Sequence, residues 1–263
     1  MPALPRIFDA HLHPERLSDV DLETLLHFGI LRALAVAQAA AEPSAEVLRA
    51  QLDGLLDEQL PRLERAGVEA FLAVGVHPRS VPRRGLEAVL DRLLQAFDHR
   101  RVVALGEIGL HHGGAAEEDA LVEQLRLARR LRVPVLVHTP EHERERHTRR
   151  LLTLIRAHGP PPERVLVDHV SPRTLPLVLG CGHWAGLTIQ VGALRAERAV
   201  LLVKRAGSER LVLNSDAGGR PGDLLSLARA VHLLGRAGLS ERVLSRVAWS
   251  NAAAFLGVEK APR

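Results

Sequence analysis

Residues 102–138 read VVALGEIGLHHGGAAEEDALVEQLRLARRLRVPVLVH, and this stretch contains the unit that decides the fold. Two short apolar runs, 102–105 and 133–137, enclose a longer segment, 117–131, with apolar residues at helical spacing. The runs lack the alternation of a strand with one wet face, so they are typical of strands buried on both faces of a parallel sheet. The predicted unit is a strand, a helix and a second, parallel strand.

The same alternation of apolar runs and amphipathic segments continues along the chain. Further runs occupy residues 6–10, 30–37, 68–76, 165–167, 184–189 and 211–213, so eight strands are predicted in all. Segments 44–60 and 223–234 are predicted helices, with Ser44 and Asp223 placed to cap them. Eight such units predict an α/β fold, a single (β/α)8 TIM barrel with 1–263 as one domain. A doubly wound open sheet has the same local pattern and is the alternative.

Length and composition fit this fold and exclude several classes of protein. A chain of 263 residues suits one eight-fold barrel, and 46% hydrophobic with 25% charged residues excludes a disordered chain. The net charge of +4 is spread along the predicted helices, so it is weak evidence for nucleic-acid binding. The chain shows no signal peptide and no membrane-spanning run, so a cytoplasmic protein is expected. The single cysteine excludes a CxxC metal or redox motif.

Metal-ligand side chains stand at the C-terminal ends of the predicted strands. The first strand ends in His11-Leu12-His13, and residues i and i+2 of a strand point to the same side. The other strand-end candidates are Glu107, His138, His169 and Asp216. In a closed barrel all of these ends meet on one face, where this fold carries its chemistry. The sequence therefore predicts one metal site at the mouth of the barrel.

The ligand types indicate which cations the site would hold. Histidine and carboxylate donors without a thiolate suit Zn²⁺, Mn²⁺, Ni²⁺, Co²⁺ or Fe²⁺. Four histidines and two carboxylates are too many for one catalytic ion with an open position. They suit two ions roughly 3.5–4 Å apart. Two divalent metal ions are therefore expected, with their identity left open.

Seven pieces of the sequence, in a fixed order, carry a family resemblance. They are 8–13 (FDAHLH), 74–78 (VGVHP), 106–110 (GEIGL), 137–139 (VHT), the segment around His169, Asp216 and 251–253 (NAA). Together they resemble the TatD-related metal-dependent hydrolases of the amidohydrolase-like barrel superfamily, over nearly the whole chain. The resemblance implies that His11 and His13 hold a first metal, that Glu107 bridges two metals, and that His138 and His169 hold the second. It further implies that Asp216 binds the first metal and handles the proton of the attacking water.

The chain departs from the family pattern where a substrate would lie. His138-Thr139-Pro140 lacks the arginine that many members have two residues after the histidine. His111-His112 stands where an Asp-Tyr pair is common, 168–172 reads DHVSP, and Asn214-Ser215 replaces a Glu-Thr pair. These differences indicate a divergent branch, whose nuclease activity is not assumed.

In the expected mechanism, two metals lower the pKa of a bridging water from 15.7 to about 7, and Asp216 accepts its proton. His77, His111 and His112 are candidates for substrate contact, with exposed loop residues as the equal alternative. Asp9 is expected to support His11 as an outer carboxylate, and Asp168 to support His169.

Two further groups of polar residues are expected to be structural. Segment 141–150 mixes charges at helical spacing and predicts a solvated helix that includes His142 and His147. Asn251 is expected to cap a short helix over 252–256.

Three functions remain open at this level. Phosphoester hydrolysis is favoured, because arginines stand in several predicted loops, including Arg79, Arg83, Arg84, Arg195 and Arg220. Amide, ester or lactone hydrolysis would use the same metals, and a non-catalytic metal-binding barrel is the third possibility. The partner is a phosphoester or another small molecule, with nucleic acid weakly supported. Oligomeric state is not predicted.

Overall fold

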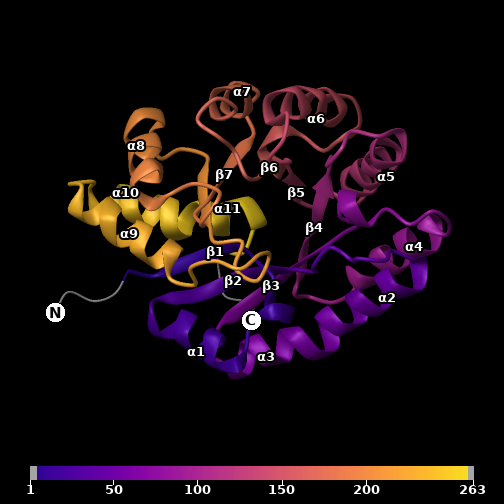
Figure 1. The fold of residues 1–263 in the computed structure, drawn as a ribbon, viewed down its shortest axis with the longest axis horizontal. Helices are drawn as coiled ribbons and strands as arrows, with labels where there is room; N and C mark the ends of the chain where they lie inside the picture. The colour runs from indigo at the N-terminus through magenta and orange to yellow at the C-terminus, as the bar shows by residue number, and fades with distance from the viewer. Residues whose placement is uncertain (1–4, 260–263) are drawn as a thin grey trace.

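Eight parallel strands form one sheet, in which each strand pairs with the next along the chain. The computed structural model describes residues 5–259. Its strands are β1 (Ile7–Leu12), β2 (Ile30–Val36), β3 (Glu69–Val74), β4 (Val102–Gly109), β5 (Val135–His138), β6 (Val165–Val167), β7 (Trp184–Thr188) and β8 (Leu211–Asn214). The sheet curls into a barrel with helices around it (Figure 1). The predicted TIM barrel is therefore confirmed and the open sheet is excluded.

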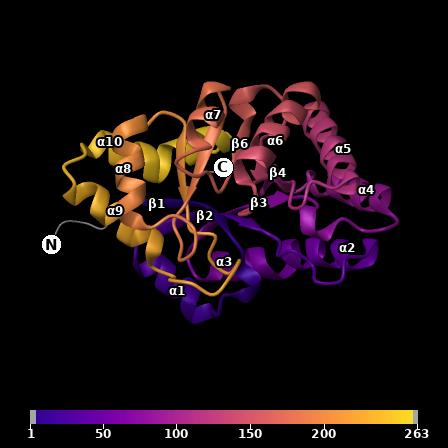
Figure 2. The ribbon, with the colours of Figure 1, turned by 45° about the horizontal axis from the view of Figure 1, so that its top comes forward.

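Helices follow the strands and cover the outside of the sheet, as both ribbon views show (Figures 1 and 2). They are α1 (Asp19–His27), α2 (Ala45–Gly54), α3 (Leu60–Arg65), α4 (Leu86–Ala96), α5 (Ala115–Leu131), α6 (Arg144–His158), α7 (Leu175–Gly180), α8 (Ala196–Ala206), α9 (Ser226–Arg236), α10 (Glu241–Ser245) and α11 (Asn251–Leu256). Short 3₁₀ turns lie at Pro14–Arg16, Pro78–Ser80 and Pro162–Arg164. π-helical turns over Leu55–Gln59 and Arg246–Ser250 join α2 to α3 and α10 to α11. Among the described residues, no helix combines the length and apolarity that crossing a membrane requires.

The barrel closes between β1 and β8 through hydrogen bonds just past the strands. The backbone N–H of Asp216 donates to the carbonyl of His11 at 3.0 Å. The backbone N–H of His13 donates to the carbonyl of Ala217 at 2.7 Å. We call this pairing the seam. Predicted metal ligands from both ends of the chain are therefore placed side by side by backbone geometry.

Alternate strand residues fill the inside of the barrel, and the residues between them pack against the helices. Phe8, Phe71 and Leu136 are buried in the inner cluster. Their strand neighbours, such as Ile7, Leu72 and Val137, belong to the outer cluster under the helices. A strand buried on both faces needs apolar residues at every position, which explains the continuous runs in the sequence.

The end of the barrel opposite the mouth is covered by aromatic rings and arginines. Phe8 lies 6.0 Å from Trp249, between ring centroids. The guanidinium groups of Arg6 and Arg32 lie 4.2 and 4.8 Å from the Trp249 ring centroid. These contacts cover the N-terminal end of the barrel, the face of this fold whose residues contribute to stability.

The boundaries of the predicted helices are partly confirmed. The Ser44 side chain accepts from the backbone N–H of Val47 at 3.1 Å, so it caps α2 as expected. Asp223 caps a turn instead, accepting from Leu225 N at 3.0 Å, and α9 begins only at Ser226.

Two structural expectations were wrong. His147 is not a solvated residue but a buried one, on the inner face of α6. Asn251 does not cap a helix, because a π-helical turn runs into α11 without a break. Its side-chain amide instead donates to the carbonyls of Ser208 and Leu211, both at 2.7 Å.

Candidate metal centre

The predicted ligands come together at the C-terminal ends of five strands. His11 lies in β1, Glu107 in β4 and His138 at the end of β5. The remaining predicted ligands, His13, His169 and Asp216, follow β1, β6 and β8 within two residues. A cavity of about 370 Å³ opens over them, lined by five of the six ligands together with His77, His111, Arg79, Glu141 and Arg220. His11 is the exception, because it is fully buried beneath the cavity floor.

His11 and His13 point their Nε2 atoms at the same place. The two atoms are 3.1 Å apart. The Nδ1–H of His13 donates to the carbonyl of Val36 at 3.0 Å, because a carbonyl can only accept. The Nδ1 of His11 lies 2.7 Å from the Asp168 carboxylate, which likewise accepts. In the neutral rings both Nε2 atoms therefore carry lone pairs that face each other.

Glu107 lies between two groups of imidazoles. Its Oε1 is 2.7 Å from His138 Nδ1 and 3.1 Å from His169 Nε2. Its Oε2 is 3.6 Å from His11 Nε2 and 3.7 Å from His77 Nε2. One carboxylate thus offers a separate oxygen to each side of the site.

His169 has a defined tautomer as well. The Thr188 hydroxyl donates to Asp168 Oδ1 at 3.2 Å, which leaves its oxygen to accept from His169 Nδ1–H at 2.8 Å. The Nε2 lone pair of His169 then faces Glu107 Oε1, another acceptor. His169 and Asp216 both have left-handed backbones, with φ of 53° and 51°. Such conformations are uncommon outside glycine and cluster where function requires them.

The donor set fits a bound divalent cation. When the rings are neutral, three contacts join two acceptor atoms at hydrogen-bond distance: His11 Nε2 with His13 Nε2 (3.1 Å), His169 Nε2 with Glu107 Oε1 (3.1 Å), and His13 Nε2 with Asp216 Oδ1 (3.2 Å). Facing lone pairs repel unless a proton or a metal ion lies between them. Three groups of ligand atoms converge within 4.8 Å, and His11, His13 and Glu107 form one of them.

The buried carboxylates favour positive charge on the groups around them. Burial lowers the pKa of His11, but Glu107 and Asp168 outweigh it and raise that pKa to about 10. Burial raises the pKa of Glu107, but His11 and His138 outweigh it and hold that pKa well below its usual value. The centre is thus electrostatically suited to cations.

The outer carboxylates are arranged differently from the sequence expectation. Asp168, rather than Asp9, accepts from the ring of His11. Asp9 accepts from the backbone N–H groups of His11 (3.2 Å) and Ser215 (2.9 Å), so it positions the strand ends. Burial raises the pKa of Asp9 to about 6, against the hydrogen bonds from Ser215.

Sequence reasoning missed the residues that orient Asp168. Asn214 donates to its Oδ1 at 2.8 Å, and Thr188 binds the same oxygen. A Cβ on Gly186 would lie 2.1 Å from that oxygen, so glycine on β7 leaves room for the carboxylate. Asn214 directly precedes Ser215-Asp216 and could have been found as a strand-end polar residue.

The three candidates for substrate contact lie in different surroundings. His77 is buried, and its Nδ1 accepts from the backbone N–H of Arg79 at 3.0 Å. Its neutral ring therefore carries the proton on Nε2, which faces Glu107. Burial, against the Glu107 charge, lowers the pKa of His77 to about 3. His111 lines the cavity, whereas His112 is exposed and packs edge-on against His111.

A parallel eight-stranded barrel with buried imidazoles and carboxylates at the C-terminal strand ends defines the class of amidohydrolase-like, metal-dependent hydrolases. Sequence comparison narrows the class. Residues 8–220 match the TatD related DNase family, and the chain belongs to it.

Individual relatives agree with this assignment. A protein of Methanocaldococcus jannaschii named as an uncharacterised metal-dependent hydrolase is 31% identical over 251 residues, covering 95% of this chain and 99% of the relative. The crystal structure of a TatD-like protein from Archaeoglobus fulgidus is 32% identical, with a TM-score of 0.82, covering 95% of this chain and all of that one. A β-aspartyl dipeptidase of Fervidobacterium islandicum shares the fold at 17% identity, with a TM-score of 0.70, over 98% of this chain and 75% of its own. The protein is a metal-dependent hydrolase of the TatD type.

Proposed function

We propose that the enzyme is a binuclear hydrolase that cleaves phosphoesters. The observation that carries the proposal is Glu107, whose two oxygens face different imidazoles, as a bridging carboxylate would. The ions would be Zn²⁺, Mn²⁺, Ni²⁺, Co²⁺ or Fe²⁺. One ion would take His11, His13 and Asp216, and the other His138 and His169, within a single domain.

Two bound ions would supply Lewis acidity and a water of lowered pKa. The residues around them would do the rest of the chemistry. Asp216 lies at the cavity wall, 3.2 Å from His13, where it can accept the proton of the attacking water and pass it to the leaving group. The Nε2–H of His77 is available to donate to a substrate oxygen. His111 and His112 are further candidates for contact at the rim.

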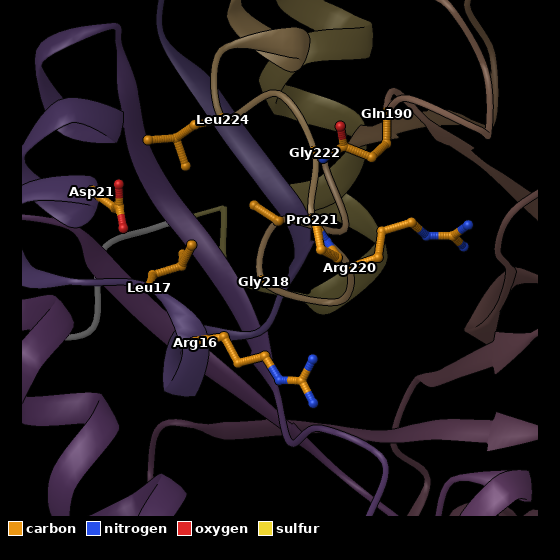
Figure 3. A pocket seen from close by; sticks show the side chains of 10 residues that line it. Arg16, Leu17, Asp21, Gln190, Gly218, Arg220, Pro221, Gly222 and Leu224 are labelled. Atoms are coloured by element: carbon orange, nitrogen blue, oxygen red, sulfur yellow. The ribbon is translucent and has the colours of Figure 1, made fainter.

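Arginines at the mouth favour an anionic substrate. Arg79 and Arg220 line the cavity, and Arg220 Nε lies 3.9 Å from Asp216. Arg220 also lines a second pocket, of about 280 Å³, together with Arg16 (Figure 3). A guanidinium group suits the paired oxygens of a phosphoryl group. The pocket would accept the portion of the substrate beyond the scissile bond.

Amide, ester or lactone hydrolysis is the alternative, and one contact favours it. The Glu141 carboxylate also lines the cavity and forms an ion pair with Arg220. This pair reduces the positive charge available to a phosphate, so a neutral substrate would be favoured if the pair persists.

A substrate panel with an arginine variant separates the two reactions. The enzyme is loaded with Mn²⁺, Co²⁺, Ni²⁺ or Zn²⁺ and assayed on a nitrophenyl phosphodiester, a phosphomonoester, a lactone and a dipeptide. Arg220→Gln should lower kcat/KM for a phosphoester about 10-fold or more, because a charge-assisted contact is lost. Arg229→Gln, on exposed α9 surface, is the matched control. Turnover of the lactone or dipeptide alone would favour the alternative, and turnover of nothing would favour a metal-binding protein.

The bridging role of Glu107 is tested by metal content. Glu107→Ala should reduce the bound metal to one ion per chain or none, because each ion loses a shared oxygen. Elemental analysis of the purified variant measures this directly. Two ions per chain in Glu107→Ala would contradict the assigned role.

A further inference from the structure

A second group of histidines lies at the rim of the cavity, outside the metal centre. His111 and His112 come from the loop between β4 and α5, and His142 and His147 from the segment after β5. The ring centroids of His111, His112 and His142 lie 4.5, 5.3 and 5.4 Å apart, and His147 lies 5.5 Å from His142. We call these four residues the rim cluster.

The spacing of these rings suits shared coordination. Imidazole nitrogens bind Zn²⁺ at about 2.0–2.1 Å in a tetrahedral arrangement, which places ring centroids roughly 5 Å apart. Unlike the ligand atoms of the metal centre, the ring nitrogens of three rim-cluster residues do not all lie within 4.8 Å of one another in the described structure. His112 and His142 are exposed, so rotation of these two side chains can complete the site.

His147 supplies an independent sign that a ligand belongs here. Its Nε2 is buried and makes no hydrogen bond with any residue of the described part of the chain, 5–259, where the nearest carboxylate oxygen, Glu143 Oε2, is 4.0 Å away. An unpaired buried polar atom costs about 1–3 kcal/mol, and such atoms in native structures point to an ion or water.

The loop that carries His111 and His112 is held against His147. Gly113 has a φ of 76°, and a Cβ on it would lie 2.8 Å from His147 Cε1. The Glu117 carboxylate accepts from the backbone N–H groups of His111, His112 and Gly113, at 2.7 to 3.0 Å. The backbone is therefore fixed with its imidazoles beside those of the next loop.

We propose that the rim cluster is a further cation site, separate from the catalytic centre and built from imidazoles alone. Nitrogen ligands select Zn²⁺, Ni²⁺ or Cu²⁺ and disfavour Mg²⁺ and Ca²⁺. An ion here would tie the β4–α5 loop to the β5–α6 loop at the mouth of the cavity. For His111 and His112 this role differs from both alternatives that the sequence leaves open, substrate contact and an exposed loop position.

Metal stoichiometry tests the proposal without an activity assay. Metal-free enzyme is titrated calorimetrically with Zn²⁺, and bound zinc is then counted by elemental analysis. The wild type should bind one ion per chain more than His112→Gln/His142→Gln. The matched control, His27→Gln/His232→Gln, removes two exposed histidines elsewhere and should bind the same number as the wild type.

Two further variants separate ligation from a structural role. His142→Cys should keep the additional ion, because a thiolate also binds Zn²⁺, whereas His142→Gln should lose it. Equal zinc counts in the wild type and His112→Gln/His142→Gln would overturn the proposal. If the proposed binuclear centre were wrong, Glu107→Ala would bind as many metal ions per chain as the wild type. That result is independent of the difference in bound zinc between the wild type and His112→Gln/His142→Gln.

Discussion

At the scale of single residues, the tautomer of each histidine separates candidate metal ligands from hydrogen-bond donors. His11, His13 and His169 each use Nδ1–H on an acceptor and keep an Nε2 lone pair for the centre. His77 has the opposite arrangement, since its Nδ1 accepts from a backbone N–H. These four imidazoles therefore divide into two chemical roles, because the hydrogen-bond partner of each Nδ1 atom differs.

This division predicts the behaviour of His77→Ala. Its metal content should equal that of the wild type, whereas kcat/KM should fall about 100-fold, because a donor that faces the reacting atoms is lost. Elemental analysis and steady-state kinetics provide the two measurements. His77→Gln, whose amide can still donate, should recover part of the loss. Reduced metal content in His77→Ala would instead assign His77 as a ligand.

Sequence patterns predicted which candidate ligands come together, but not which residues support them. His11 and Asp168 are 157 positions apart, and no periodicity shows that their side chains meet. Asp9 seemed the nearer partner because it shares a face with His11. Asp9 instead accepts from the backbone N–H of Ser215, next to the seam. Support of a ligand depends on side-chain direction across neighbouring strands, which only the assembled barrel fixes.

At the scale of elements, the β4–α5 loop is organised by one side chain of the first turn of α5. Burial raises the pKa of Glu117, but the backbone N–H groups of His111, Gly113 and His112 outweigh it and lower that pKa. A folded-state pKa below the unfolded value stabilises the fold above the unfolded pKa. That contribution is lost as the pH falls through the folded pKa.

Glu117→Gln should therefore lower the free energy of unfolding by about 1 kcal/mol at pH 7, a modest value because the side chain is partly exposed. The difference from wild type should shrink below about pH 4, where carboxylates become protonated. Urea unfolding at both pH values measures it. Glu123→Gln, which loses only an exposed ion pair with Arg126, should change stability by less than about 0.5 kcal/mol. A difference that persists unchanged at low pH would contradict this account.

The strands were the most predictable elements, because burial on both faces leaves a continuous apolar run. Segment 165–167 was predicted with the bounds that β6 has. β4 extends to Gly109, beyond the predicted 105, so Glu107 lies within a strand and not after it. The apolar run stops at Leu105, because the rest of β4 contains Gly106, Glu107 and Gly109. The inner face of α6 was missed for a related reason, since His147 is polar by type but buried by position.

At the scale of the whole molecule, the metal centre connects strands from around the barrel. Its donors belong to or follow β1, β4, β5, β6 and β8. Metal ions at this centre would join side chains from five strands, so metal binding should stabilise the entire fold and not one loop.

Chelation should therefore lower the melting temperature by about 5–10 °C, as expected for a few kcal/mol of binding free energy in a chain of this size. Calorimetric scans of the chelated and metal-loaded enzyme provide the measurement. In Glu107→Ala, the melting temperatures of the chelated and metal-loaded forms should differ by less than they do in the wild type. Identical transitions in the chelated and loaded wild type would mean that the centre contributes nothing to the fold.

The seam has a consequence for biosynthesis. During translation, the carboxylate of residue 216 and the backbone that pairs with residues 11 and 13 emerge some two hundred positions after those two imidazoles. An unfinished polypeptide on the ribosome cannot close the ring, so it presents only a fragment of the chelate. Metal binding by the complete candidate set therefore requires that translation has passed residue 216.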